Sequence, residues 1–310
     1  MKTAFVFPGQ GAQKVGMGLS LAEACPAAKA VFEQTDEALG MRLSSLCFEG
    51  PEEELRLTEN TQPAILATSI AALRCLEGRG GRADFVAGHS LGEYSALVAA
   101  GALQFEDALR VVRQRGQFMQ EAVPAGEGAM AALLGADAET VEAVCREASE
   151  RGVCSPANIN SPNQVVIAGH KSAVEYAVTL ARQRGAKRAV MLAVSAPFHC
   201  ALMKPAAERL ARVLADTVVA DLNVPLITNV DAALITSGDT ARAALVGQVA
   251  SPVRWSESIK RLLDEGVTRF VELGPGKVLS GLIKRMQPDA EILNVEDAPS
   301  LEATAAIVGF

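Results

Sequence analysis

Residues 84–101 read DFVAGHSLGEYSALVAAG, and this stretch decides the fold class. A short apolar run at 84–87 leads into the pentapeptide GHSLG at 88–92, and a helical pattern then continues until Gly101. An apolar run that ends at glycine is typical of a buried strand, so the stretch predicts a strand, a tight turn and a helix. Strands followed directly by helices are the building units of α/β proteins.

The pentapeptide fits G-x-S-x-G, which places a nucleophilic serine on a sharp turn between a strand and a helix. On such a turn the Ser90 hydroxyl projects from the carboxyl edge of the sheet, beside the free N–H groups that begin the helix. Glycine at 88 and 92 would allow the tight backbone and close packing. If Ser90 were only a helix cap, both glycines would be unexplained. Ser90 is therefore the candidate nucleophile.

The alternation of short apolar runs and helical patterns continues on both sides of this stretch. We expect further strands at 3–7 and 269–273 and helices at 27–39, 63–76, 106–122 and 278–285, with Pro63 in the first turn of its helix. Strands that alternate with helices predict a mainly parallel sheet that is covered on both faces.

The middle of the chain follows a different order. Its patterns predict a strand, a helix, two strands, a helix and a strand, at 129–134, 138–150, 153–159, 164–168, 171–184 and 188–194. This β-α-β-β-α-β order is that of ferredoxin-like domains. We therefore expect a small domain at 124–196, inserted into a large catalytic domain made of 1–123 and 197–310. A ligand cleft is expected where the two meet.

A serine nucleophile needs a base, and the chain has only three histidines. His89 adjoins Ser90, and on a sharp turn neighbouring side chains diverge, so we expect it to serve packing. His170 lies where a strand gives way to a helix, which suggests a surface or capping role. His199 lies where the small domain would return to the large one, and it is the candidate base. No Asp or Glu is obviously placed to orient it, and a backbone carbonyl could do so instead.

The helix expected at 106–122 carries an arginine on its apolar face. Arg115 lies four residues after Val111, on a stripe with the i, i+3, i+4, i+7 spacing of a core-facing surface. A buried guanidinium costs on the order of several kcal/mol unless a partner compensates its charge. A structural ion pair or a side chain that reaches solvent would explain it. The functional interpretation is a substrate with a free carboxylate, which predicts selectivity for acyl groups that end in one.

Composition excludes several function classes. The 310 residues carry 29 Lys+Arg and 36 Asp+Glu, and the net charge of −7 argues against coating nucleic acid or an anionic membrane. No apolar stretch approaches the roughly 20 residues that span a bilayer, and the apolar run at the start is too short for a signal peptide. The six cysteines are scattered without a C-x-x-C pair, so we expect reduced thiols in the cytoplasm and no metal site. Neither Gly9-Gln10-Gly11 nor Gly276-Lys277 completes a nucleotide-binding motif.

A series of motifs in this chain closely resembles the malonyl-CoA:acyl-carrier-protein transacylases, the freestanding enzymes of dissociated fatty-acid synthesis. The motifs are FVFPGQG at 5–11, GHSLGEY at 88–94, RQRG at 113–116, NINSP at 158–162, the segment that ends in His199, and ELGPG at 272–276. The resemblance implies an α/β-hydrolase-like large domain and a ferredoxin-like small domain. It also implies a ping-pong reaction without cofactors, from malonyl-CoA to the phosphopantetheine thiol of acyl carrier protein.

The resemblance assigns catalytic roles by matching position. Ser90 would take the malonyl group as an ester, with His199 as base and then as acid. The backbone N–H groups of Gln10 and Leu91 would form the oxyanion hole. The backbone carbonyl of Gln248 would orient His199, which would account for the missing carboxylate.

The resemblance also implies how substrate and partner bind. Arg115 would hold the malonyl carboxylate and Met119 would line the pocket. Phe198 resembles malonyl-selective relatives and would disfavour branched extender units, since some members have serine there. A monomer would bind the acidic carrier protein transiently, through basic residues such as Lys187-Arg188 or Lys284-Arg285 unless these are only solvated charges.

Two other function classes remain open. A serine esterase or thioesterase of the α/β-hydrolase type shares the serine turn, but it expects an acid between serine and histidine in chain order and gives no reason for Arg115. A module that binds the carrier protein without catalysis would keep the fold. Partition of the acyl group between thiol and water distinguishes the first, and an ester on Ser90 excludes the second.

Overall fold

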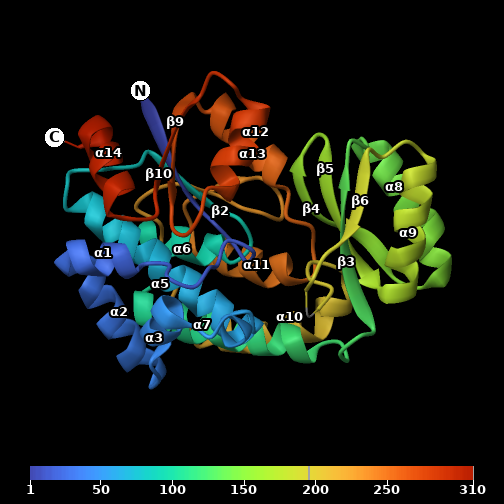
Figure 1. Ribbon diagram of the computed structural model, residues 1–310, viewed down its shortest axis with the longest axis horizontal. Coiled ribbons are helices and arrows are strands. Elements are labelled where there is room, and N and C mark those ends of the chain that lie inside the picture. Colours follow the sequence, from blue (N-terminus) through green and yellow to red (C-terminus); the bar gives the residue numbers. More distant parts are fainter. Residues whose placement is uncertain (195, 310) are drawn as a thin grey trace.

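The computed structural model describes residues 1–194 and 196–309, and it contains a larger and a smaller sheet (Figure 1). The larger sheet has the order β10-β9-β1-β2-β7-β8. Its strands are β1 (Lys2–Phe7), β2 (Phe85–Gly88), β7 (Leu226–Ile227), β8 (Leu234–Ile235), β9 (Val267–Leu273) and β10 (Glu291–Val295). From β10 to β7 neighbouring strands are parallel, and only β7 and β8 pair antiparallel. The prediction of a mainly parallel sheet is confirmed.

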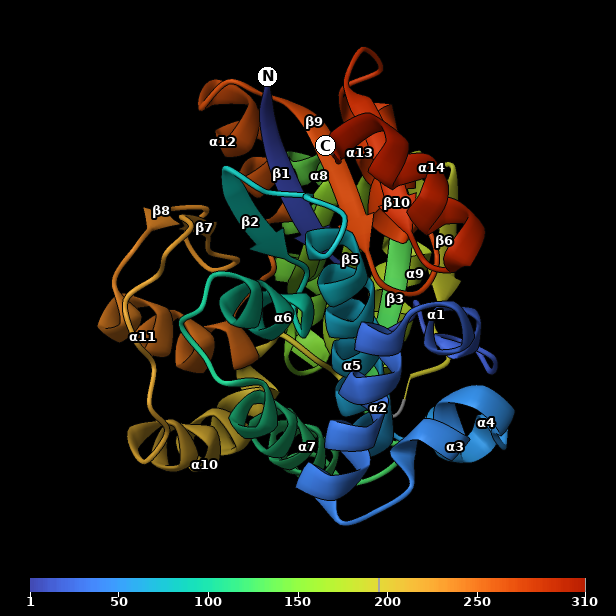
Figure 2. The ribbon, with the colours of Figure 1, turned by 90° about the vertical axis from the view of Figure 1, so that its left-hand side faces the viewer.

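Helices cover both faces of this sheet. The helices of the larger part are α1 (Leu19–Ala24), α2 (Pro26–Leu39), α3 (Leu43–Glu49), α4 (Glu52–Leu55), α5 (Thr58–Glu77), α6 (Gly92–Ala99), α7 (Phe105–Glu121), η2 (Ala201–Met203), α10 (Lys204–Ala215), α11 (Gly238–Val249), α12 (Trp255–Asp264), α13 (Val278–Met286) and α14 (Ala298–Val308). In β1, Phe5 and Phe7 join the core formed with α5, α6 and α7, whereas Ala4 and Val6 face α12 and α13. Figure 2 shows α2 and α7 in the lower half of the molecule, α5 running through its centre, and α12 and α13 at the top. The alternation of side chains along β1 explains why both faces of the strand are apolar.

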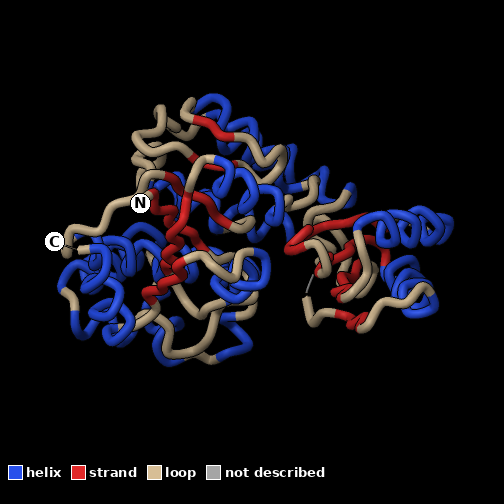
Figure 3. Tube along the Cα trace, turned by 90° about the horizontal axis from the view of Figure 1, so that it is seen from above, coloured by secondary structure: helices blue, strands red, loops and turns tan. Residues whose placement is uncertain are grey.

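The smaller sheet has the order β4-β5-β3-β6, and all of its strand pairs are antiparallel. Its elements are β3 (Gly128–Leu134), α8 (Ala138–Ala148), η1 (Ser149–Arg151), β4 (Cys154–Ser161), β5 (Gln164–His170), α9 (Lys171–Gln183) and β6 (Arg188–Met191). The predicted strand and helix order is therefore present. Ala131 and Leu133 pack with α8 and α9 in a separate core, and Met130 and Val166 join the core of the larger part. Figures 1 and 3 show this unit beside the larger sheet.

The helix predicted at 63–76 begins five residues earlier than expected. It spans Thr58–Glu77, so Pro63 lies inside the helix and not in its first turn. The backbone N–H groups of Asn60 and Thr61 both bond to the carbonyl of Leu57, which establishes the first turn ahead of the proline. The predicted start of this helix was wrong because the preference of proline for the first turn does not take into account the residues before it, which here are already helical.

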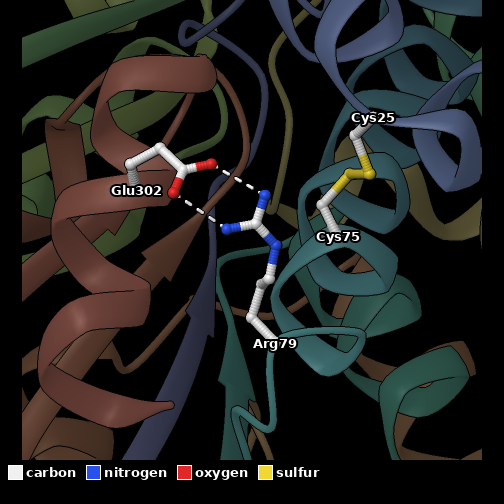
Figure 4. The surroundings of a disulfide bond; sticks show 4 residues. All are labelled: Cys25, Cys75, Arg79 and Glu302. Atoms are coloured by element: carbon white, nitrogen blue, oxygen red, sulfur yellow. Dashed lines mark hydrogen bonds and ion pairs between the residues drawn. A yellow bond between two sulfur atoms is a disulfide. The ribbon is translucent and has the colours of Figure 1, made fainter. Parts of the chain in front are cut away.

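The expectation that all cysteines are reduced is wrong for one pair. Cys25, which precedes α2, and Cys75 in α5 form a disulfide, and Figure 4 shows it beside the ion pair of Arg79 and Glu302. Packing of the helices brings the two Cα atoms to 6.3 Å although 50 residues separate them in sequence. Spacing along the chain does not reveal such a contact. The other four cysteines are free and buried: Cys47, Cys145, Cys154 and Cys200.

Candidate active site

Ser90 lies on a strained turn between β2 and α6. Its φ of +52° is in the left-handed region, which residues other than glycine rarely adopt. The backbone N–H of Ser90 donates to Asn229 Oδ1 at 2.6 Å, and Asn229 Nδ2 donates to the Gly88 carbonyl at 2.6 Å. A Cβ atom on Gly88 would lie 1.9 Å from the Gly92 carbonyl carbon, and one on Gly92 would lie 2.0 Å from the Phe7 carbonyl oxygen. Strand and helix are thus too close for a side chain at either glycine.

His199 lies beside the Ser90 hydroxyl. Its Nε2 is 2.7 Å from Ser90 Oγ, and its Nδ1 is 2.8 Å from the Gln248 carbonyl oxygen. Since a carbonyl only accepts, Nδ1 carries the hydrogen, and Nε2 has its lone pair directed at the serine hydroxyl. His199 also has a positive φ of +59°, so both residues of the pair have backbones in the left-handed region. The arrangement suits proton transfer from serine to histidine.

The environment of His199 keeps its imidazole neutral. Burial, and secondly the positive charge of Arg115, lower the pKa of His199 to about 3. Both causes disfavour the charged form, so the neutral ring is maintained as pH falls through the ordinary range of histidine. A neutral Nε2 is what a general base requires.

We expect the ring of His199 to show no titration between about pH 5 and pH 8, since a depressed pKa leaves it neutral throughout. The measurement is the NMR shift of the His199 ring protons across this range, with the His199→Gln variant used to assign them. The same protons in the unfolded chain should titrate near the ordinary histidine value. A midpoint close to that value in the folded protein would contradict the expectation.

Arg115 is buried, with 2% of its surface exposed, and it reaches the serine hydroxyl. Its Nη1 donates to Gln62 Oε1 at 2.7 Å, and its Nη2 donates to Gln248 Oε1 at 2.8 Å and to Ser90 Oγ at 3.1 Å. Its Nε has no hydrogen-bond partner among the residues that the structure describes. These acceptors are all neutral, and no carboxylate among the described residues forms an ion pair with the guanidinium. The structural ion pair and the solvent-reaching side chain are therefore both excluded as explanations for Arg115.

A cavity of about 880 Å³ opens in front of Ser90, His199 and Arg115. Residues of the larger part and strands of the smaller sheet both line it, which agrees with the predicted cleft. Its lining includes Gln10, Leu91, Met119, Met130, Asn158, Asn160, Val166 and Phe198. In the part of the chain that is described, no group of three His, Cys, Asp or Glu side chains is placed to hold a metal ion.

The remaining predicted site residues also lie at this cavity. Gln10 and Leu91 both line it, and among the described residues no backbone acceptor pairs with the N–H group of either. Met119 Sδ accepts a hydrogen bond from Gln62 Nε2 at 3.8 Å, and the Phe198 side chain is buried at the cavity wall. The structure thus gathers every predicted site residue in one place.

The other two histidines have structural contacts. His89 Nε2 is 2.8 Å from Asn160 Oδ1, and its ring lies 5.6 Å from that of Trp255, which agrees with a packing role. His170 precedes α9 but makes no side-chain capping bond. Instead its Nδ1 accepts from the backbone N–H of Val153 at 2.9 Å, so its role is to fix the start of β4.

Sequence reasoning missed the polar residues that lie behind Ser90. Gln62 holds Arg115, Asn229 holds the serine turn, and Glu93 accepts hydrogen bonds from Gln248 Nε2 at 2.8 Å and from the Asn229 N–H at 3.1 Å. Glu93 lies within the GHSLGEY motif, where a carboxylate among the mostly apolar residues of a helix was a usable signal.

The candidate docking residues are at the surface: Lys187, Arg188, Lys284 and Arg285. Among the described residues, no helix has both the length and the apolar character needed to cross a bilayer.

Comparison with known proteins gives concordant results. Residues 4–303 match the family model of the acyl transferase domain. The chain is 54% identical to the malonyl CoA-acyl carrier protein transacylase of Bacillus subtilis over 302 residues, which covers 97% of this chain and 95% of the relative. It is 50% identical to the protein of the same name from Escherichia coli over 303 residues, covering 97% and 98% of the two chains.

Solved structures agree with the fold along its whole length. The malonyl CoA-acyl carrier protein transacylase of Coxiella burnetii matches with a TM-score of 0.98 at 44% identity, covering 100% of this chain and 98% of the other. A type II PKS acyl-carrier protein in complex with its malonyl-transacylase provides another match, with a TM-score of 0.97 at 46% identity and 99% coverage of both chains. The chain therefore belongs to the family of malonyl CoA-acyl carrier protein transacylases.

Proposed function

We propose that this chain moves a malonyl group from malonyl-CoA to the phosphopantetheine thiol of acyl carrier protein through an ester on Ser90. The observation that carries the proposal is the chain of contacts from Ser90 Oγ through His199 to the Gln248 carbonyl, next to an arginine that pairs with no carboxylate among the described residues. The contacts among Ser90, His199 and Gln248 supply a nucleophile with its base. Arg115 supplies a cation that can bind an anionic acyl group.

The first half-reaction transfers the acyl group to serine. His199 Nε2 accepts the hydroxyl proton while Ser90 Oγ forms a bond to the thioester carbon. The N–H groups of Gln10 and Leu91 stabilise the oxyanion, which is the largest electrostatic contribution expected in acyl transfer. The C–S bond then breaks, and His199 returns the proton to the sulfur of coenzyme A.

The second half-reaction runs the same steps with the carrier thiol as nucleophile. His199 takes the thiol proton, sulfur attacks the ester carbon, and the proton returns to Ser90 Oγ as the ester bond breaks. Neither half-reaction needs a redox group or a metal, because one nucleophile and one proton acceptor complete each step. Transfer exceeds hydrolysis when the bound thiol is oriented for attack and water is not.

Arg115 would select the acyl group. In the free protein its guanidinium donates to two amide oxygens and one hydroxyl, which a malonyl carboxylate would join or replace with stronger charge-assisted bonds. Met119 and Phe198 lie on the same cavity wall and would pack against the short malonyl chain. Phe198 would also disfavour branched extender units by its size.

We further propose that the two sheets mark two domains, an α/β-hydrolase-like domain of 1–123 and 197–310 and a ferredoxin-like domain of 124–196. The β-α-β-β-α-β order and the separate core of α8 and α9 support this division. Residues 195 and 310, which these ranges include, lie outside the described residues.

The proposed partner is acyl carrier protein, bound transiently by a monomer. The solved complex of a related malonyl-transacylase with its carrier protein supports such a partner. A cytoplasmic location and a role in fatty-acid biosynthesis follow from the family resemblance. An esterase or thioesterase is not favoured, because among the described residues the partner of His199 Nδ1 is a carbonyl and not a carboxylate.

Incubation with malonyl-CoA should increase the intact mass of the protein by one malonyl group, and the peptide that contains Ser90 should carry it. Ser90→Ala should show no increase, whereas Ser172→Ala, an exposed serine of the smaller sheet unit, should behave like the unaltered protein. Addition of phosphopantetheinylated carrier protein should then remove the group to the carrier thiol. An adduct that persists in Ser90→Ala, or none at all, would overturn the proposal.

A further inference from the structure

Two buried groups of opposite charge lie behind the nucleophile without touching each other. Arg115 faces the cavity, and Glu93 is 1% exposed in the first turn of α6, three residues after Ser90. The side-chain amide of Gln248 connects them. Its Oε1 accepts from Arg115 Nη2 at 2.8 Å, and its Nε2 donates to Glu93 Oε2 at 2.8 Å.

The charges on both sides fix which way this amide faces. A guanidinium only donates and an ionised carboxylate only accepts, so one of the two orientations satisfies both partners. In that orientation Nε2 also donates to the Ser90 carbonyl at 3.0 Å. Turning the amide over would place its NH₂ group against Arg115 and its oxygen against Glu93, which breaks both bonds. A buried amide with unmatched neighbours is costly, so ionised Glu93 stabilises the same orientation that Arg115 and the Ser90 carbonyl favour.

We propose that Glu93 is a positioning residue for malonyl selectivity: it holds the Gln248 amide so that Gln248 Oε1 fixes the Arg115 guanidinium toward the acyl carboxylate. The inference rests on the proposed function and adds to it the group that orients the selecting cation. Glu93 acts through Gln248 and does not touch the acyl group. Its loss should therefore affect malonyl more than an uncharged acyl group of similar size.

The surroundings of Glu93 make this arrangement sensitive to pH. Burial raises the pKa of Glu93 to about 7, opposed by the hydrogen bonds from Gln248 and Asn229 and by the charge of Arg115 on α7. The other ionisable groups near it are Tyr94 on its own helix and Asp231 after β7. Above its pKa the Glu93 carboxylate accepts from Gln248 Nε2 and helps to hold the amide, whereas below it the protonated acid can donate and holds the amide less firmly. Malonyl preference should thus rise with pH through this range.

The test compares acylation of Ser90 by malonyl-CoA and by acetyl-CoA in the Glu93→Gln variant. A glutamine at this position can present either oxygen or NH₂ to Gln248, so the ratio of the two kcat/KM values should fall roughly tenfold, the factor that about 1.4 kcal/mol represents. Glu93→Asp keeps the charge and should restore part of the ratio. Asp231→Asn removes a nearby exposed carboxylate that bonds to neither Gln248 nor Asn229, and at about pH 8, where Glu93 is ionised with or without it, this variant should leave the ratio unchanged.

An unchanged ratio in Glu93→Gln, or an equal loss with both substrates, would overturn the inference, because either result describes a residue that serves folding alone. If Glu93→Gln does not fold, the ratio is measured in the unaltered protein from about pH 6 to about pH 8, where steps common to both substrates cancel. A rise supports the inference, and a constant ratio overturns it. Formation of the malonyl ester in the unaltered protein is checked first, so failure of the proposed function is distinguished from failure of this inference.

Discussion

Replacing His199 by alanine should lower the rate of Ser90 acylation by malonyl-CoA about 10³-fold or more, the range expected when a serine nucleophile loses its base. Nothing else in the described structure that contacts Ser90 Oγ accepts its proton, because Arg115 Nη2 only donates. The serine would remain in place, since its turn is held by Asn229. The measurement is a single-turnover experiment in which the malonyl ester is followed by intact mass.

His170→Ala is the matched control, because it removes a histidine that fixes the start of β4 and lies outside the cavity. Thermal unfolding of both variants shows whether a slow rate reflects lost structure. Added imidazole should restore part of the activity of His199→Ala by occupying the vacated position. If that variant acylates within tenfold of the unaltered protein while folded, His199 is not the base.

The local part of the site was predictable because its signals lie within a few residues. The run from 84 to 101 contains a strand, a helix and two glycines that have no room for a Cβ atom. The tight serine turn requires all of these features. The burial of Arg115 was equally readable, since helical periodicity determines which face of α7 a residue occupies. Short-range geometry and periodicity therefore located the candidate nucleophile and the buried cation before any contact was known.

The partners of these residues were not predictable, because packing of distant segments creates them. Gln62 and Gln248 lie 53 and 133 residues from Arg115 in sequence, and Asn229 lies 139 residues from Ser90. A glutamine in a helical pattern looks the same whether it faces solvent or a buried guanidinium. The disulfide of Cys25 and Cys75 belongs to the same class, as its two cysteines meet only when α2 packs on α5.

Replacing Arg115 by alanine should lower kcat/KM for malonyl-CoA about 100-fold or more and leave acetyl-CoA nearly unaffected or improved. A carboxylate bound by two charge-assisted hydrogen bonds, at about 1.5–3 kcal/mol each, would lose both. The acetyl group has no charge to lose, and removal of a buried cation without a carboxylate partner relieves its desolvation cost. The measurement is the acylation rate of Ser90 with each thioester, expressed as a ratio so that general damage to the serine cancels.

Arg110→Ala provides the comparison on the same helix, since Arg110 is exposed and pairs with Asp107. It should leave both rates unchanged, because surface ion pairs of this kind contribute little. An equal loss of malonyl and acetyl transfer in Arg115→Ala would mean that the guanidinium supports the Ser90 hydroxyl, to which it donates at 3.1 Å, and does not recognise the acyl group. If Arg115→Ala loses malonyl transfer and keeps acetyl transfer, recognition of the acyl carboxylate explains why α7 buries a charged residue on its apolar face.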